Sequence, residues 1–189
     1  YSAILYVLRL ICKKEIPLNE GLMKNVQIHS PKGTFLHPEF EDNPRKCPAV
    51  VGGNTEVSQR LVDTLLKAFG VAACSQGTMN NFLFGNDKFG YYETICGGVG
   101  AGEGFEGRSA VHQHMTNTKI TDPEEMEWRY PVQLNRFEVR KDSGGKGKWT
   151  GGVPPLGYDI DPEKHVLVIN GAQHFREKVY AERKPDSGR

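Results

Sequence analysis

The opening segment, residues 1–14, carries apolar side chains nearly all round a helix. This pattern predicts a buried helix rather than one with a solvated face. Lys13 and Lys14 suit its C-terminal end because their charges complement the helix dipole. Further along, the apolar pattern predicts a strand over residues 26–30, and the many prolines and acids of residues 31–48 predict a loop.

A second helix is predicted over residues 52–70, where apolar residues recur at helical spacing. Asn54 or Thr55 can cap its first turn, and Gly70 can end it. Its apolar face consists of Val57, Leu61, Leu65 and Phe69. We expect truncation of a fully buried leucine on this face to leave a destabilising cavity.

Aromatic and alternating segments dominate the rest of the chain. Residues 79–86 and 89–98 predict a hairpin or two sequential strands. Residues 130–141 alternate as a strand, with a one-residue slip at Asn135 and Arg136 that indicates a bulge. A last strand is predicted over residues 165–171.

A short helix is predicted to begin at Thr121 or Asp122, because Pro123 and two acids follow in its first turn. Strands outnumber helices along the chain as a whole. The fold class predicted is α+β, a strand-rich domain with two or three helices.

Composition fits one soluble globular domain, with 189 residues, 38% hydrophobic and 25% charged. Lys and Arg number 24 against 23 Asp and Glu, so no overall field favours a nucleic acid. The longest mostly apolar run, residues 3–12, contains Arg9 and is shorter than the roughly 20 residues that span a membrane. No signal peptide surrounds this run. We expect no membrane and no nucleic-acid partner.

Four cysteines are spread along the chain without compact zinc spacing, at Cys12, Cys47, Cys74 and Cys96. Disulfides are rare in the cytosol. The spacing therefore favours reduced, mostly buried thiols in a cytoplasmic protein.

A glycine-rich segment contains GEGFEG, residues 102–107, which formally matches the dinucleotide-binding pattern GxGxxG. That site requires a helix to open at the motif, with its N-terminal amides facing the pyrophosphate. The chain instead continues with β-branched and polar residues. A flexible or tightly turning loop is the favoured interpretation.

His112 and His114 follow this segment, two residues apart. On an extended strand both side chains would share one face. They could then be metal ligands, or a ligand and a general base, with Asp122 or Glu93 as the carboxylate. The alternative is that one histidine is exposed while the other makes a local hydrogen bond.

Polar residues near these histidines are open to the same two interpretations. Asn117 and Thr118 could orient a substrate amide or carboxylate, or could bond their own backbone in a turn. In CSQGTMNN, residues 74–81, Ser75 or Cys74 could be a nucleophile, but no GxSxG elbow surrounds the serine. Turn formation and backbone capping are favoured there.

Four segments, in this order, resemble the hydantoinase B/oxoprolinase family. They are IPLNEGLMKNVQI, AVVGGNTEVSQRLVDTLLKAFG, SQGTMNNFLFG and the long run from FGYYETICGG to KWTGG, which contains HQHMTNTKITDPE. The resemblance covers residues 1–152 and matches the later portion of a B-type subunit. Residues 153–189 form a divergent tail, either because intervening residues are missing or because this is a shortened variant.

The resemblance implies ATP-dependent ring opening of a cyclic amide such as 5-oxoproline or a hydantoin. It further implies an A-type subunit or domain that binds ATP and Mg, and a divalent metal in an upstream region with no counterpart here. Two alternatives stay open, a portion of a ketone carboxylase subunit and a non-catalytic binding or assembly module.

The HQHMTNTKITDPE segment looks like one of the motifs that define the family. The resemblance therefore favours His112, His114 and Asp122 as catalytic residues. Amide and imidazole donors can stabilise charge that develops on a lactam oxygen, and a carboxylate or neutral histidine can accept a proton from water. The residues expected to bind substrate are Asn117, Thr118, Asn80 and Glu93.

Overall fold

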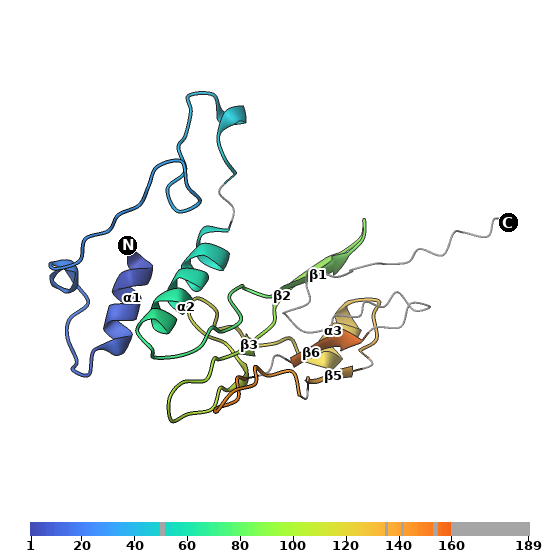
Figure 1. Cartoon of the computed structure of the whole chain (residues 1–189). Coiled ribbons are helices and arrows are strands. Elements are labelled where there is room, and N and C mark those ends of the chain that lie inside the picture. Colours follow the sequence, from blue (N-terminus) through green and yellow to red (C-terminus); the bar gives the residue numbers. More distant parts are fainter. Residues whose placement is uncertain (50–51, 135, 141, 153–154, 160–189) are drawn as a thin grey trace.

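The structure is a computed structural model that describes residues 1–49, 52–134, 136–140, 142–152 and 155–159 (Figure 1). The helices are α1 (Ser2–Ile11), α2 (Gln59–Ala68) and α3 (Pro123–Arg129), with short helical turns η1 (Glu20–Met23), η2 (Pro44–Lys46) and η3 (Gly53–Ser58). The strands are β1 (Asn81–Gly85), β2 (Gly90–Thr94), β3 (Gly97–Gly98), β4 (Ser109–Val111), β5 (Arg136–Val139) and β6 (Pro155–Asp159). The predicted α+β class is confirmed. In the described residues the strands pair as three separate two-stranded antiparallel sheets.

Helix α1 packs against α2, which Figure 1 shows beside it. Ala3 and Val7 are buried against Val62 and Leu66 of α2. The prediction that α1 is buried all round is wrong, because Leu10 remains 52% exposed. Helix α1 carries apolar side chains on every side, but α2, the described helix that packs against it, covers only one face of α1. The helix ends at Ile11, before the predicted Lys13.

Helix α2 begins later than predicted, after the π-helical turn η3. The N–H groups of Glu56 and Val57 both donate to the carbonyl of Gly52, at 3.0 Å. Because this wide turn already starts at Gly52, Asn54 and Thr55 lie inside it, and the prediction that one of them is the cap is wrong. Gly70 ends the helix as predicted, with a left-handed φ of +68° that glycine adopts without strain.

The predicted hairpin is confirmed by β1 and β2, which pair antiparallel from Asn81 opposite Thr94 to Gly85 opposite Gly90. One face of the hairpin is buried and carries Phe82, Tyr91 and Glu93, whereas Leu83 and Tyr92 are exposed on the other. The buried face, α3 and the segment after it form the larger core. Its buried members are Phe82, Tyr91, Ile95, Met126 and Val132.

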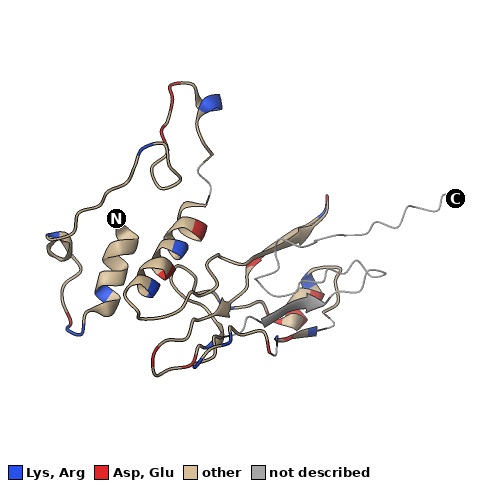
Figure 2. Cartoon of the chain, viewed as in Figure 1, with Lys and Arg blue, Asp and Glu red and all other residues tan. Residues whose placement is uncertain are grey.

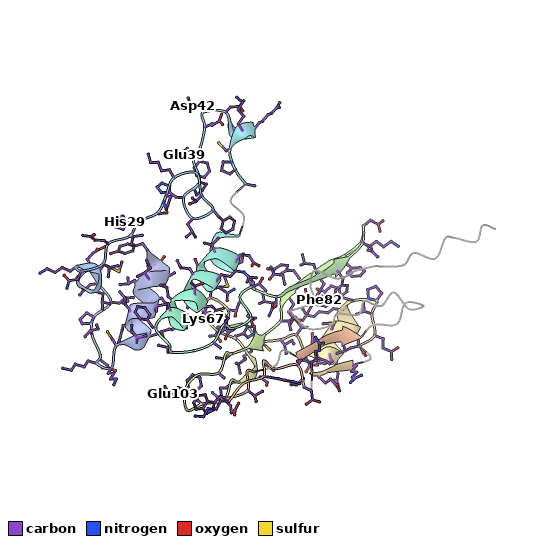
Figure 3. All side chains as sticks on the ribbon, viewed as in Figure 1. His29, Glu39, Asp42, Lys67, Phe82 and Glu103 are labelled. Atoms are coloured by element: carbon purple, nitrogen blue, oxygen red, sulfur yellow. The ribbon has the colours of Figure 1, made fainter. Side chains whose placement is uncertain are left out.

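The predicted strand over residues 26–30 is not formed. No described strand lies beside this segment to pair with its backbone N–H and C=O groups. An alternating sequence does not form a strand without such a partner. Residues 24–43 instead form a long connection without helix or strand, along which Figure 3 labels His29, Glu39 and Asp42. The predicted loop over residues 31–48 is confirmed apart from the short turn η2.

The predicted strand over residues 130–141 shortens to β5, which pairs with β6. Its register shifts between Arg136 and Glu138, next to the predicted bulge. Asn135 and the predicted strand at residues 165–171 lie outside the described residues. The pairing with β6 was not predicted, because residues 155–159 begin with Pro155, directly after Pro154, and have no clear alternation.

Basic and acidic segments are interspersed over the described elements (Figure 2). In the part of the chain that the structure describes, no helix is long and apolar enough to cross a membrane. All four cysteines are free, as predicted, but the prediction that they are mostly buried is wrong. Cys74 is exposed and the other three are half-buried.

Candidate functional site

The glycine-rich segment forms the tight turn that its composition predicts. Gly102 and Phe105 exchange backbone hydrogen bonds across the turn, and Gly104 adopts a φ of +85°. The chain then enters strand β4 rather than a helix. The helix N-terminus that a dinucleotide pyrophosphate requires is therefore absent at this motif within residues 97–120, all of which are described.

His112 and His114 lie beyond the end of β4 at Val111, so they do not share one face of an extended strand. The chain turns between Gln113 and Thr116, whose backbone N–H donates to the Gln113 carbonyl at 3.1 Å. His114 has a φ of +54° within this turn. The prediction of one shared face is wrong, because the left-handed residue turns the chain and each ring reaches different partners.

His114 belongs to a compact polar cluster with Asp63 and Ser75. Its Nε2 lies 3.1 Å from Oδ1 of Asp63 and 3.4 Å from Oγ of Ser75. The Ser75 hydroxyl donates to both carboxylate oxygens, at 2.7 and 2.9 Å. Only 11% of the His114 side chain and 5% of the Asp63 side chain are exposed. We call these three residues the His114 cluster.

Three chain segments build the His114 cluster. Asp63 is on the buried face of α2, Ser75 follows that helix, and His114 follows β4. Tyr6 of α1 completes the surroundings, with its hydroxyl 3.4 Å from Nδ1 of His114 and the two rings edge to face. The packing of α1 on α2 therefore helps to hold the imidazole in place.

The His114 cluster differs from a Ser–His–Asp triad in the path of its hydrogen bonds. In a triad the histidine bonds the serine and the aspartate through different ring nitrogens. Here Nε2 faces both Asp63 and Ser75, and the serine hydroxyl is directed at the carboxylate. The arrangement orients an imidazole and a hydroxyl around one buried carboxylate. Such groups can accept a proton or stabilise developing charge.

His112 lies in a separate environment. Its Nε2 is 3.3 Å from the hydroxyl of Thr118, and its Nδ1 is buried without a hydrogen-bond partner among the described residues. Burial lowers the pKa of His112 below its usual 6.5, although a hydrogen bond with the Thr118 backbone and the charge of Glu93 act in the opposite direction. The neutral imidazole is therefore favoured in the folded chain.

We expect this lowered pKa to make folding less stable in mild acid. As the pH falls below about 6.5, His112 takes up a proton in the unfolded chain before it does so in the folded one, which lowers the free energy of unfolding. Above that pH the effect vanishes. His112→Gln should weaken the loss of stability between about pH 7.5 and about pH 5.5, measured by urea unfolding. Substitution of the exposed His29 by Gln should not change this loss of stability. The same loss of stability in His112→Gln as in the unmodified chain would contradict the assignment of the effect to His112.

Glu93 and Asn80 are buried near the base of the hairpin. Glu93 accepts hydrogen bonds from the Tyr91 hydroxyl at 2.8 Å and from the backbone N–H of Thr121. Asn80 has a φ of +53°, and its side-chain amide finds no partner among the described residues. An unpartnered buried amide is uncommon in proteins and fits a group that meets a ligand.

The remaining predicted site residues lie at the surface. Asp122 caps α3, accepting from the N–H of Glu124 at 2.9 Å, and so begins the helix where it was predicted. Asn117 is exposed, and the Thr118 hydroxyl donates to the Thr94 carbonyl at 3.4 Å. The structure thus links His112 with Thr118 but holds His114 apart, with Asp63 and Ser75.

Sequence reasoning missed Asp63 as the partner of His114. A signal was present, because the buried face of α2 carries Gln59 and Asp63 four residues apart beside Val62 and Leu66. Polar residues at such positions require partners, since an unpaired buried carboxylate is costly. Among the described residues, no three His, Cys, Asp or Glu side chains come together as metal ligands.

The described residues thus form an α+β fold. In this fold His114, from the predicted HQHMTNTKITDPE motif, lies in a buried polar site with Asp63 and Ser75. The profile of the hydantoinase B/oxoprolinase family matches residues 1–168. The chain belongs to this family. The matched range contains every residue of the His114 cluster and every predicted site residue.

Relatives in distant organisms agree with this assignment. The chain is 52% identical to 5-oxoprolinase 1 of Arabidopsis thaliana over 167 residues and 54% identical to a 5-oxoprolinase of Dictyostelium discoideum over 151 residues, covering 88% and 80% of this chain. It is also 51% identical over 169 residues, 80% of the chain, to a 5-oxoprolinase of Saccharomyces cerevisiae. These matches span 13%, 12% and 13% of the relatives' own lengths. No solved structure matches the chain significantly.

Proposed function

We propose that the chain is the C-terminal portion of a B-type component that opens a cyclic amide, 5-oxoproline or a hydantoin, in an ATP-dependent reaction in the cytoplasm. The observation that carries the proposal is the 52–54% identity to proteins named 5-oxoprolinase over 80–88% of this chain. The buried His114 cluster supports it, because lactam hydrolysis needs groups that move a proton and stabilise charge on oxygen.

In this proposal His114 acts on the proton of the attacking water or of the ring nitrogen. Asp63 fixes the orientation of the imidazole at 3.1 Å, and Ser75 donates to that carboxylate and holds it in place. The roles of the other site residues stay predictions. They are catalysis for His112 and Asp122, and substrate binding for Asn117, Thr118, Asn80 and Glu93. Of these, His112 and Asn80 have buried polar atoms without a partner among the described residues, as a substrate-lining group would.

The proposal assigns ATP and Mg to an A-type subunit or domain. The sequence has no GxxxxGK[ST] phosphate-binding loop that would hold a nucleotide. A divalent metal is assigned to an upstream B-type region, since the described residues of this chain do not gather a ligand set.

We expect the purified 189-residue chain to show no turnover of 5-oxoproline with ATP, and the native gene product to show turnover when its A-type component is supplied. Release of phosphate and of the ring-opened product would be measured for both. Turnover by the 189-residue chain clearly above buffer would contradict the proposed division of labour.

The same assay separates the alternatives. Consumption of a ketone that depends on bicarbonate would identify a carboxylase instead. A native gene product that turns over no cyclic amide and no ketone in the presence of the A-type component would favour a binding or assembly module.

A further inference from the structure

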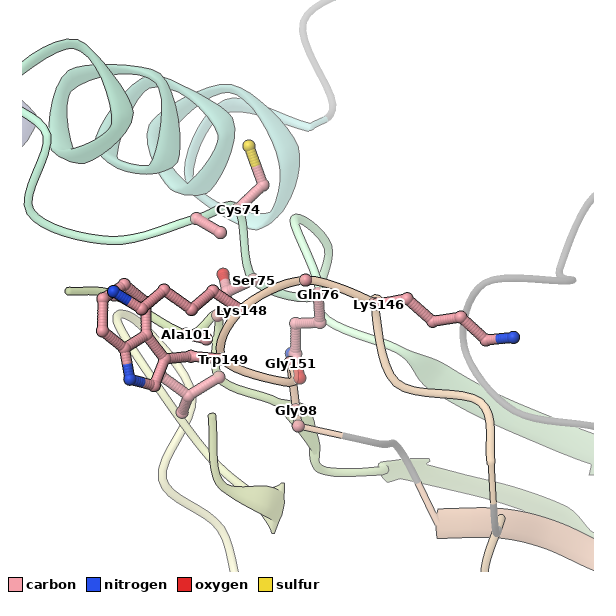
Figure 4. A pocket seen from close by; sticks show the side chains of 16 residues that line it. Cys74, Ser75, Gln76, Gly98, Ala101, Lys146, Lys148, Trp149 and Gly151 are labelled. Carbon is pink, nitrogen blue, oxygen red and sulfur yellow. The ribbon is translucent and has the colours of Figure 1, made fainter. Parts of the chain in front are cut away.

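A pocket of about 340 Å³ shares Ser75 with the His114 cluster, and Figure 4 shows the residues that line it. Its walls come from three segments of the chain, residues 73–76, 98–102 and 145–152. Ser75 belongs to both places, because it lines the pocket and donates its hydroxyl hydrogen bond to Asp63. The pocket and the polar cluster therefore meet at the Ser75 side chain.

Backbone hydrogen bonds join the three walls of the pocket. The N–H of Ala73 donates to the carbonyl of Ala101 at 2.7 Å, and the N–H of Gly152 donates to Val99 at 3.0 Å. A Cβ added at Gly100 would lie 2.0 Å from the carbonyl oxygen of Ala73, so this position accepts only glycine without a shift. Such ties make a pocket that is formed before any ligand arrives, which reduces the loss of entropy on binding.

The charged side chains that line the pocket are both cations, Lys146 and Lys148. The ammonium group of Lys148 lies 4.6 Å from the centre of the Trp149 ring, and Figure 4 shows the two side chains together at one end of the pocket. The Lys146 side chain points away from Ser75 in the same view. Among the described residues, no carboxylate lines the pocket to neutralise these charges.

We propose that this pocket binds a small organic or inorganic oxyanion, a carboxylate or a phosphate, with Lys148 as its charged partner. The Trp149 ring covers the apolar part of the ligand, and the Ser75 end of the pocket presents the ligand to His114. The proposal rests on the proposed function for the identity of the carboxylate, which we take to be that of 5-oxoproline. A charge-assisted hydrogen bond from a lysine gives such a ligand an advantage over its uncharged analogue.

All the pocket-lining residues belong to this chain, so binding can be tested on the 189-residue chain without ATP or a second subunit. The chain has two tryptophans, and Trp128 is 81% exposed on α3. In a Trp128→Phe background the fluorescence reports on Trp149 alone. The probes are 5-oxoproline, its uncharged analogue 2-pyrrolidinone, and inorganic phosphate at equal ionic strength.

We expect saturable quenching by 5-oxoproline, with 2-pyrrolidinone binding at least about tenfold more weakly. Lys148→Gln should weaken 5-oxoproline binding by about tenfold or more, since the charged partner is lost. Lys88→Gln, at the exposed tip of the hairpin, removes the same charge far from the pocket and should have no effect. Circular dichroism would confirm that each variant remains folded.

Phosphate that binds as tightly as 5-oxoproline and loses affinity in Lys148→Gln would identify the ligand as a phosphate. Equal binding of 5-oxoproline and 2-pyrrolidinone, no saturable response to either anion, or full affinity in Lys148→Gln would overturn the proposal. Failure here leaves the proposed function standing if the native gene product still hydrolyses 5-oxoproline. Conversely, anion binding without hydrolysis by that gene product would support the proposed binding pocket and contradict the proposed reaction.

Discussion

Phe82→Ala should lower the free energy of unfolding by about 3–5 kcal/mol, the range found when a buried aromatic side chain is truncated. Phe82 is completely buried on the inner face of β1, where it contacts Phe84 and Tyr91 with ring centres 5.2 and 5.9 Å apart (Figure 3). Met126 of α3 is equally buried in the same core. The substitution removes a completely buried ring from the core that the hairpin and this helix share. Chemical denaturation followed by circular dichroism would measure the change.

Leu83 is a matched control, because it is the next residue on the same strand and faces the other way. It is 59% exposed, so Leu83→Ala should change the free energy of unfolding by no more than about 0.5 kcal/mol. Similar losses for both variants would show that the hairpin does not pack through the face that carries Phe82. A small loss for Phe82→Ala alone would mean that the core around α3 relaxes to fill the space.

Local chemistry accounts for the parts of the fold that sequence reasoning predicted. The hairpin follows from two aromatic runs separated by GNDKFG, in which the Asn86 side chain accepts the N–H groups of Lys88 and Phe89. The start of α3 follows from Asp122 and Pro123. The Asp122 side chain accepts a hydrogen bond from a free N–H of the first turn, and Pro123 has a φ that already suits a helix. In each case the residues that decide the structure lie within a few positions of it.

The parts that sequence reasoning missed depend on distant partners. Whether α1 is buried on one side or on all sides is decided by the elements that cover it, and in the described residues only α2 does so extensively. Leu65 illustrates the same point. Its spacing predicts an apolar position on α2, but the structure leaves it only partly buried at the edge of the α1–α2 core. Phe82 is therefore the better test of core packing.

The candidate site shows the same division. The glycine turn and the polar character of residues 112–118 could be predicted, because composition determines them. The pairing of His114 with Asp63 joins residues 51 positions apart and depends on the left-handed turn at His114. Spacing along the chain does not specify that turn, since such a conformation is uncommon for a residue other than glycine.

His114→Ala should reduce turnover by the native gene product, with its A-type component, by about 10²–10³-fold. The imidazole is almost buried, is held 3.1 Å from Asp63, and adjoins the Ser75 hydroxyl that lines the pocket. Its loss removes the proposed proton-transfer group while Asp63 keeps both hydrogen bonds from Ser75. We therefore expect a smaller fall in melting temperature than Phe82→Ala produces. The measurements are kcat per folded molecule and thermal unfolding of the same preparations.

His114→Gln separates proton transfer from positioning, because glutamine can still donate a hydrogen bond to Asp63 but cannot titrate near neutral pH. If His114 transfers a proton, the Gln and Ala variants should lose turnover alike. Recovery of most of the turnover in His114→Gln would instead assign His114 to positioning. If His114→Ala unfolds as readily as Phe82→Ala while its folded fraction retains normal kcat, the turn at residues 113–116 serves the fold and His114 takes no part in the reaction.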